Sequence, residues 1–404
     1  MYMEDLNNKT YDYVLVGGGM GSGFATLGIR EQDKTGSILI ISNETEAPYE
    51  RPALSKKLWL DDEFEEEDTK IGAEEEENVE FVFEREVIKI TPEDKTVTLE
   101  NGDVVGYEKL LLSTGGEPNS IEGPEDEDVF TFRELNDYRK LRQRSGNNQE
   151  VIVVGGGYIG SELAASLSKN NTNVTMVFPE NQLGEDMFPE ELLEEYNNLF
   201  IENGVKLMSG REAESYRREG NQLILTLDDG SEVKGDTIVI GLGVTPRIKL
   251  AKESGLEMSD QGVVVNEKLQ TSDENIWAAA DIAVYPDVIL GRQRLEHVDH
   301  ARNSGRQVGA NMAGANEAYT HTPYLYSMLY SLNWEAVGTL DPSLETLFDH
   351  RESGDIVFYL DEDKLKGVLT WNVNVNLDDV RELLDNPPTN KEDLIGALEE
   401  QPEE

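Results

Sequence analysis

The feature that most constrains this chain is an internal duplication. Residues 13–41 have the order of an apolar strand, a glycine-rich turn, a helix of small residues and a second apolar strand. Residues 150–178 repeat that order, with a helix expected over residues 161–168. This is the order of a βαβ unit, which builds a parallel sheet. The duplication therefore predicts an α/β protein with two Rossmann-like domains, each binding one dinucleotide.

Both repeats carry the glycine spacing of a phosphate-binding turn. Such a turn needs one glycine to bend, a second to let the backbone approach the pyrophosphate, and a third to pack helix against strand. The second repeat fills all three places, with Gly155, Gly157 and Gly160. The first repeat has Gly17 and Gly19 in the first two places and Ser22 in the third. Serine is small enough for us to expect the same turn there.

An acidic residue that follows the second strand of such a unit binds the ribose hydroxyls and repels a 2′-phosphate. Glu180 holds this place in the second repeat, with no arginine beside it in the sequence, which favours NADH over NADPH. The other interpretation of Glu180 is a solvated loop acid after Pro179. In the first repeat Asn43 holds the place and Glu44 follows, so either residue could reach the ribose.

A third, smaller domain is expected after residue 320, where the glycine pattern stops. Residues 356–360 and 366–371 are typical of an antiparallel hairpin, and residues 377–384 of a helix. We expect a frayed tail beyond Leu398. The predicted domains are a discontinuous first dinucleotide-binding domain (residues 1–120 and 244–320), a second (residues 121–243) and a C-terminal α+β domain (residues 321–404).

Cysteine is absent from all 404 residues, which excludes a redox-active disulfide and a thiolate-bound iron–sulfur cluster. We also predict no metal site. Redox chemistry in this chain must therefore depend on a bound cofactor. No apolar stretch approaches the roughly 20 residues of a membrane span, and the first ten residues have neither signal-peptide nor transit-peptide character. We expect a soluble, cytoplasmic protein.

The chain is strongly acidic, with 82 acidic against 35 basic residues and a formal charge of −47. Phosphate contacts need a basic surface, so we expect no nucleic-acid partner. Repulsion among so many carboxylates destabilises a compact state at low salt, and the Debye length falls to about 3 Å at about 1 M salt. We therefore hypothesise a halophile-type surface; the alternative is an ordinary acidic protein with solvated acidic runs.

Residues 48–56, Pro-Tyr-Glu-Arg-Pro-Ala-Leu-Ser-Lys, follow the first glycine turn. Together they resemble the apoptosis-inducing factor and ferredoxin reductase branch of the FAD- and NAD-dependent pyridine nucleotide oxidoreductases. The resemblance continues through residues 113–118, 241–246, 271–281, 294–301, 334–338 and 367–371. It implies two Rossmann-like domains of the glutathione-reductase type, binding FAD and NAD(H), and a small α+β C-terminal domain. The large insertion of the animal apoptosis-inducing factor is missing, so its targeting and DNA-related roles are not carried over.

The resemblance also assigns residues to FAD. Arg51 and Lys56 are placed at the pyrophosphate and the flavin, and Lys56 pairs with Glu162 of the second glycine helix. A lysine there would stabilise the negative charge that reduction brings to the flavin. Asp281 is a further contact, but Ala280 stands where the family usually has glycine. The remaining FAD residues are Gly17, Gly19, Met20, Gly21, Asn43, Glu44 and Arg133. Val87 and Gly115 are further expected cofactor-binding residues. Lys56 could otherwise be a surface cation, and Arg133 a helix-capping one.

For NADH the resemblance implies the second glycine turn and a group near the nicotinamide. These residues are Gly155, Gly157, Tyr158, Ile159, Gly160, Glu180, Gly243, Glu296, His297 and Glu335. The family places the His297 imidazole over the flavin, where it can donate a hydrogen bond in either protonation state; with Lys56 and Glu162 it completes the expected catalytic group. His300 is expected to be structural. Tyr326 either stacks on a cofactor ring or packs in the core.

These assignments predict an oxidoreductase that accepts hydride from NADH on FAD and passes electrons to a further acceptor. A ferredoxin or rubredoxin, a quinone and oxygen are the acceptors considered. The alternative is an NADH-sensing flavoprotein whose reduction controls homodimerisation or partner binding. Disulfide reduction and peroxide reduction through a cysteine are excluded because the chain has no cysteine.

Overall fold

The computed structural model describes residues 6–402 of the chain and divides it into two compact units. Unit 1 comprises residues 1–51, 65–117 and 245–323, and unit 2 comprises residues 52–64, 118–244 and 324–404. Two short strands, β7 (Gly116–Pro118) and β16 (Val244–Pro246), pair with each other where the chain passes between the units. The three-domain division expected from the sequence stays a prediction.

Unit 1 is built on a seven-stranded sheet. Its order is β3-β2-β1-β6-β5-β4, and β18 pairs with β6. The strands β1, β2, β3, β6 and β18 are parallel, whereas β5 and β4 continue the sheet as an antiparallel hairpin. The bounds are β1 Thr10–Val16, β2 Ile38–Ile41, β3 Val79–Val82, β4 Val87–Thr91, β5 Thr96–Leu99, β6 Val104–Leu112 and β18 Ile276–Ala278. All four residues of β2 are buried, as expected for a strand covered on both faces.

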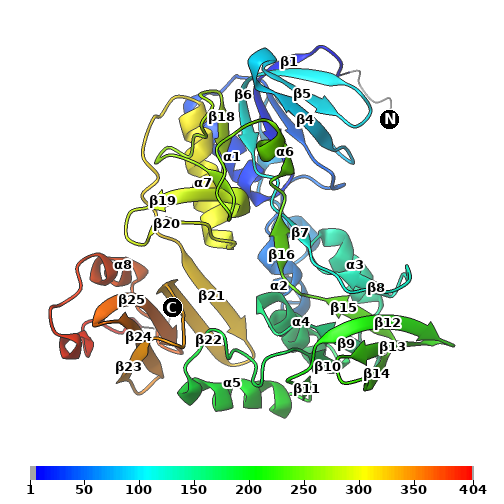
Figure 1. The fold of residues 1–404 in the computed structure, drawn as a ribbon, viewed down its shortest axis with the longest axis vertical. Coiled ribbons are helices and arrows are strands. Elements are labelled where there is room, and N and C mark those ends of the chain that lie inside the picture. The colour runs from blue at the N-terminus through cyan, green and yellow to red at the C-terminus, as the bar shows by residue number, and fades with distance from the viewer. Residues whose placement is uncertain (1–5, 403–404) are drawn as a thin grey trace. The chain divides into compact units, whose positions relative to one another are not determined.

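Helices α1 (Met20–Gln32) and α7 (Val298–Met312) of unit 1 lie side by side (Figure 1). Glycine makes this close packing possible. A Cβ atom on Gly28 would lie 2.0 Å from the carbonyl oxygen of Arg306, and one on Gly309 would lie 2.0 Å from that of Ala25. Larger side chains at these two positions would push the helices apart.

The rest of unit 1 consists of short elements. A small sheet has the order β17-β19-β20. The bounds are β17 Val263–Val264, β19 Ala283–Asp287, β20 Gly291–Gln293 and α6 Lys249–Glu253, with the short 3-10 helices η2 Glu66–Thr69, η3 Ala73–Glu75, η4 Pro92–Asp94 and η5 Ala280–Ile282. The 3-10 helix η1 (Arg51–Leu54) continues into unit 2.

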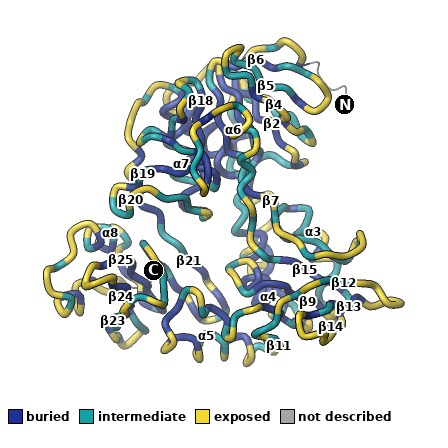
Figure 2. The backbone as a smooth tube through the Cα atoms, viewed as in Figure 1, coloured by how far each residue is buried: buried dark blue, intermediate teal, exposed yellow. Residues whose placement is uncertain are grey.

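Unit 2 contains a five-stranded parallel sheet of order β11-β10-β9-β15-β8 and a three-stranded antiparallel sheet, β12-β13-β14. The central strand β9 and its neighbour β15 are almost entirely buried, whereas exposed residues gather in the connecting turns (Figure 2). The bounds are β8 Val129–Thr131, β9 Glu150–Val154, β10 Asn173–Val177, β11 Lys206–Met208, β12 Ala213–Glu219, β13 Gln222–Leu227, β14 Glu232–Gly235, β15 Thr237–Ile240, α2 Lys57–Leu60, α3 Leu135–Gln143, α4 Tyr158–Lys169 and α5 Glu190–Glu202.

The C-terminal part of unit 2 is an antiparallel sheet of order β21-β22-β25-β24-β23. It packs through aromatic rings against α4 and the segment before α5: the Tyr158 ring of α4 lies 5.8 Å from Trp334, and Phe188, two residues before α5, contacts Trp334 and Trp371 edge-on at 5.4 and 5.1 Å between ring centroids. Edge-to-face pairs of this kind add to the free energy gained from burial. The bounds are β21 Tyr324–Leu329, β22 Leu332–Gly338, β23 Glu345–His350, β24 Asp355–Asp361, β25 Lys364–Trp371, α8 Leu377–Asp385 and η6 Lys391–Leu394.

Most of the secondary structure expected from the sequence is confirmed. Both βαβ units form, with α4 beginning three residues earlier than the expected residue 161. The expected C-terminal hairpin is β24 and β25, and the expected helix after it is α8. The tail differs: beyond Leu398 it is not frayed within the described residues, because Glu400 pairs with Val375 and the Gln401 N–H donates to the Asn374 carbonyl at 2.8 Å. The antiparallel partner, distant in sequence, explains the difference.

Ala280 adopts a left-handed backbone conformation in unit 1, with φ of +59°. Its N–H donates to Ser304 Oγ at 3.1 Å, and its methyl group is buried with Met20, Phe24 and Ala301. For a residue with a Cβ this conformation costs about 1–2 kcal/mol, which gives a physical reason for the glycine that the family resemblance implies at this place. The fold accepts the strain without losing the turn.

We expect Ala280→Gly to raise the free energy of unfolding by up to about 1 kcal/mol, or to leave it unchanged where the lost methyl contact offsets the relieved strain. Ala279 is the matched control, because it is equally buried but has an extended backbone with φ of −145°. Ala279→Gly should lower stability by about 1 kcal/mol. Urea unfolding measures both, and equal losses would contradict the strain argument.

Candidate functional site: two glycine turns and a buried ion pair

The first glycine turn, in unit 1, leaves no room for a side chain at its bend. Gly17 has φ of +116°, and a Cβ atom there would lie 2.2 Å from the Ser113 carbonyl oxygen. Gly19 is different: around a Cβ at that position the nearest atom would be Nη2 of Arg51, at 3.5 Å. The turn is therefore tight on the protein side and bordered by a guanidinium on the other, which fits the pyrophosphate of a dinucleotide.

The third place of this turn holds Ser22, which is fully buried. Its Oγ lies 3.0 Å from Ser113 Oγ, so the extra atoms are absorbed by a hydrogen bond to the end of β6. Met20 and Gly21 begin α1 and are buried beside it. Gly115 follows β6 with φ of +62°, and its carbonyl oxygen accepts from the Arg247 N–H.

At the end of β2 the structure distinguishes Asn43 from Glu44. Asn43 is exposed, whereas Glu44 is buried, accepts a 2.7 Å hydrogen bond from Tyr49 Oη and forms an ion pair with Arg51. Glu44 thus holds the arginine that borders the glycine turn. Sequence reasoning missed Tyr49, although it lies inside the residue 48–56 motif. Which of the two residues contacts a ribose stays a prediction.

Val87 lies near the carboxyl end of β2 in unit 1, close to Glu44. It begins β4 and is buried, and two residues earlier the Arg85 N–H donates to the Ser42 carbonyl at 2.9 Å. This bond brings the start of β4 to the carboxyl end of β2, next to Glu44. Strand order alone would have separated Val87 from the glycine turn, because β5 and β6 lie between β4 and β1.

The start of α7 gathers the polar residues assigned to the nicotinamide side of unit 1. Arg294 donates to the Asp281 carbonyl at 2.9 Å and forms an ion pair with Glu296. His297 is the N-cap of α7, and its Nδ1 accepts from the Asp299 N–H at 3.3 Å. A neutral imidazole whose Nδ1 accepts carries its proton on Nε2. The cap therefore selects the tautomer that donates from Nε2.

His300 is fully buried and stacks on Tyr285 with ring centroids 4.5 Å apart. Its Nδ1 lies 3.1 Å from Tyr319 Oη. Burial lowers the pKa of His300 to about 3, so the ring is neutral across the physiological range. Asp299 and His321, which sequence reasoning did not single out, form a 2.6 Å pair next to it. Their separation of 22 residues gave no signal in the sequence.

The second glycine turn, in unit 2, is likewise crowded by backbone atoms at its first and third glycines and open at its second. Gly155 has φ of +110°, and a Cβ there would lie 2.4 Å from the Gly241 carbonyl. A Cβ on Gly160 would lie 2.1 Å from the Gly155 carbonyl, whereas nothing lies within 4 Å of one on Gly157. The open side at Gly157 is the place where a pyrophosphate could approach the backbone.

Two side chains project from the first turn of α4. Tyr158 packs against Trp334 at 5.8 Å between ring centroids, and burial raises its pKa to about 12. Ile159 is 40% exposed, unusual for a large apolar residue beside a turn. Gly243, after β15, is exposed with φ of +72°. Arg133 lies just before α3, whose N-cap is Glu134, so the arginine is not itself the cap.

Lys56 and Glu162 form a buried ion pair in unit 2, with Nζ and Oε1 2.6 Å apart. The Glu162 side chain is 5% exposed and the Lys56 side chain 16%. Ser55 Oγ donates to Glu162 at 2.6 Å and Ser327 Oγ at 2.9 Å, so two hydroxyls satisfy the carboxylate that the lysine neutralises. Sequence reasoning missed both serines; Ser327 is 165 residues away from its partner in the chain.

Tyr326 and Glu335 border this ion pair. The Lys56 ammonium lies 4.9 Å from the centroid of the Tyr326 ring, within range of a cation–π interaction. Tyr326 and Glu335 face each other across β21 and β22, and burial raises the pKa of Glu335. Lys56, Glu162, Tyr326 and Glu335 are therefore one group within unit 2, with a protonatable carboxyl at one end.

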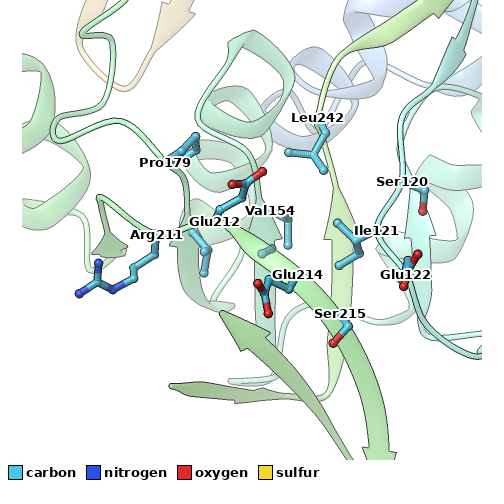
Figure 3. Close-up of a pocket in the computed structure, with 12 residues that line it drawn as sticks. Ser120, Ile121, Glu122, Val154, Pro179, Arg211, Glu212, Glu214, Ser215 and Leu242 are labelled. Carbon is cyan, nitrogen blue, oxygen red and sulfur yellow. The ribbon is translucent and has the colours of Figure 1, made fainter. Parts of the chain in front are cut away.

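A pocket of about 660 Å³ opens at the carboxyl ends of β9 and β10 (Figure 3). Val154 and Leu242 contribute apolar surface, and Glu212, Glu214 and Arg211 line it near the start of β12. The sequence has no arginine beside Glu180, but folding brings one to the same strand end. The Gly210 N–H donates to the Glu180 carbonyl at 2.7 Å and brings Arg211 to that strand end.

Comparison with known proteins agrees with this geometry. The family model for pyridine nucleotide-disulphide oxidoreductases matches residues 11–305. The chain belongs to this family. It is 34% identical over 372 residues to monodehydroascorbate reductase 4 of Arabidopsis thaliana (86% of this chain, 76% of that protein). It is 31% identical over 426 residues to apoptosis-inducing factor 1 of Dictyostelium discoideum (94% and 79%).

Among solved structures, a chain of the covalent putidaredoxin reductase–putidaredoxin complex matches with a TM-score of 0.85 at 25% identity, covering 96% of both chains. The chain is thus an NAD(P)H-dependent FAD oxidoreductase that uses FAD and NAD(H) and passes electrons to a protein or small-molecule acceptor. Unlike the disulphide reductases that the family is named after, it has no cysteine. Among the described residues, no helix is long and apolar enough to cross a membrane.

We expect Gly160→Ala to lower the affinity for NADH at least tenfold, because the new methyl group would overlap the Gly155 carbonyl and displace the second turn. Ser22→Ala is the control, since the same place in the first turn already holds a side chain. Fluorescence titration measures NADH binding, and the visible absorbance of the flavin measures the FAD content. The FAD content of both variants should equal that of the parent. Loss of FAD from Gly160→Ala would reverse the assignment of the two turns.

Proposed function

We propose that the chain is an NADH:acceptor reductase whose catalytic group consists of Lys56 and His297, with Glu162 positioning Lys56. The observation that carries this proposal is the buried Lys56–Glu162 ion pair, in a chain that also has two glycine turns whose second glycine is not crowded by a neighbouring backbone segment. Bound FAD would supply the redox chemistry, because it can accept hydride from NADH and pass electrons onward. The residues of the chain bind, orient and stabilise charge.

The ion pair itself argues for a functional role. Replacing a buried ion pair by well-packed apolar residues is often neutral or stabilising, so stability alone gives little reason to keep one. Here Ser55 and Ser327 hold the Glu162 carboxylate in place, and that carboxylate holds the Lys56 ammonium. A fixed cation needs no reorganisation when negative charge develops next to it. We assign Lys56 this role at the flavin, with Glu162 as the residue that positions it.

His297 and Glu180 are assigned to the nicotinamide coenzyme. The N-cap bond to Asp299 fixes the His297 ring and directs its proton to Nε2, as an orienting donor requires. The Glu180 carboxylate has no hydrogen bond or ion pair with another residue in the described part of the chain. It is therefore available to accept from ribose hydroxyls, which supports NADH as the coenzyme.

The similar proteins point to two classes of acceptor. The printed names indicate monodehydroascorbate, a small molecule, as the acceptor of one relative, and putidaredoxin, a protein, as the partner of the other. Because this chain has a formal charge of −47, an acidic ferredoxin could dock on it only with salt screening or at a local basic patch. We therefore propose a small-molecule acceptor such as a quinone. We also propose a cytoplasmic location. The NADH-sensing alternative predicts instead a change in oligomeric state on anaerobic reduction, which light scattering would detect.

Replacing Lys56 with methionine should slow anaerobic reduction of the flavin by NADH about 10²- to 10³-fold, the usual effect of removing one group that stabilises developing charge. Lys57→Met is the control, because Lys57 is the exposed neighbour with the same charge. Stopped-flow absorbance gives both rates. Equal effects of the two substitutions, or a parent protein that is colourless and cannot be reconstituted with FAD, would refute the proposed function.

We also propose a halophile-type surface. Charged residues are almost never fully buried unless paired, so most of the 82 acidic side chains are expected at the surface. We expect the apparent melting temperature to rise by several degrees between about 0.1 M and 2 M KCl, because salt screens the repulsion among carboxylates. NaCl should have a similar effect if screening is the cause. A protein that is no less stable in dilute buffer than in molar KCl would rule this hypothesis out.

A further inference from the structure

The pocket at the end of β10 contains one arginine that is already committed to another residue. Among the described residues that line the pocket, Arg211 is the only basic one. Three acidic residues, Glu122, Glu212 and Glu214, line it as well. Figure 3 shows the Arg211 guanidinium directed away from the other charged side chains. The pocket is therefore acidic despite the arginine.

The backbone fixes where Arg211 lies. Its N–H donates to the Phe178 carbonyl at 3.0 Å, and the preceding Gly210 N–H donates to the Glu180 carbonyl at 2.7 Å. These two bonds join residues 210–211 to the chain that follows β10. Arg211 is thus held beside the acid proposed to bind the adenosine ribose, at the place where a 2′-phosphate would have to be neutralised.

The side chain of Arg211 is held by Asp229. Arg211 Nε lies 2.8 Å from Asp229 Oδ2, and Nη1 donates to the Gly210 carbonyl at 2.7 Å. Asp229 is in turn oriented by the Ser231 N–H, which donates to Oδ1 at 2.9 Å. Hydrogen bonds from Ser231 also lower the pKa of Asp229, so the carboxylate keeps its charge near neutral pH. One oxygen of Asp229 serves the turn and the other the arginine.

We propose that Arg211 is a withheld phosphate ligand: Asp229 keeps its guanidinium from a 2′-phosphate, and the pocket thereby selects NADH over NADPH. This inference rests on the proposed function. Arginine binds phosphate strongly when its planar fork is free to donate two parallel hydrogen bonds. With Nε engaged by Asp229 and Nη1 donating to the Gly210 carbonyl, Arg211 would have to give up these contacts to turn its Nε/Nη fork toward a 2′-phosphate. Glu212 and Glu214 add repulsion against the extra negative charge of a 2′-phosphate, which NADH lacks.

Two adenosine fragments test the inference on the FAD-loaded protein without any hydride transfer. The probes are adenosine 5′-monophosphate and adenosine 2′,5′-bisphosphate, with affinities measured by isothermal titration calorimetry at one fixed salt concentration. Asp229→Asn keeps an oxygen for the Ser231 N–H but removes the charge that holds Arg211. We expect it to raise the affinity for the bisphosphate, relative to the monophosphate, about three- to tenfold. Adding Arg211→Gln should cancel that gain.

Glu232→Gln is the matched control. It removes one negative charge from the same three-stranded sheet and releases Arg217, whose Nη2 lies 2.9 Å from Glu232, but neither residue lines the pocket. An equal gain in Glu232→Gln, or a gain in Asp229→Asn that survives Arg211→Gln, would overturn the inference and leave the proposed function intact. Failure of the parent protein to bind the monophosphate would instead overturn the nucleotide site of the proposed function, and this inference with it.

Discussion

Contact between backbone atoms at two strand-to-helix turns is the constraint on which the rest of this protein depends. At Gly17 and Gly155 the chain bends so sharply, with positive φ, that a Cβ would overlap the carbonyl of a neighbouring segment. The bend directs the first turn of α1 and of α4 at the space beyond the sheet, where the N–H groups of a helix start are unpaired. Dinucleotide binding in this chain follows from that geometry before any side chain is considered.

Side chains then divide the chemistry between the units. Unit 1 contributes Arg51, held by Glu44, next to the first turn, and His297, held as a donor by its capping bond. Unit 2 contributes the Lys56–Glu162 pair, which is buried at the cost of desolvating two charges and satisfied by two serine hydroxyls. With no cysteine in the chain, none of these groups is itself redox-active. Their common property is fixed charge or fixed hydrogen-bond direction, which is what a cofactor-dependent enzyme needs from its protein.

Coenzyme choice illustrates why charge count and charge position are different properties. The sequence shows Glu180 at the expected place and no adjacent basic residue, yet folding brings Arg211 to the same strand end. What an arginine does there depends on its partner. That partner is Asp229, which lies in the turn between β13 and β14, outside the parallel sheet that contains β10. A pocket can therefore contain an arginine and still be unfavourable to a second phosphate.

The sequence by itself determined the two βαβ units, the C-terminal hairpin and helix, and the place of both glycine turns, because these depend on local spacing and apolar runs. It also supplied the family resemblance that paired Lys56 with Glu162. Tertiary structure alone decided the partners that are distant in the chain: Ser327 on Glu162, His321 on Asp299, Arg211 beside Glu180, and the pairing of the tail with Val375. No local pattern encodes such contacts, since they arise only when separate elements pack, and the left-handed Ala280 shows that packing can also override a residue's own backbone preference.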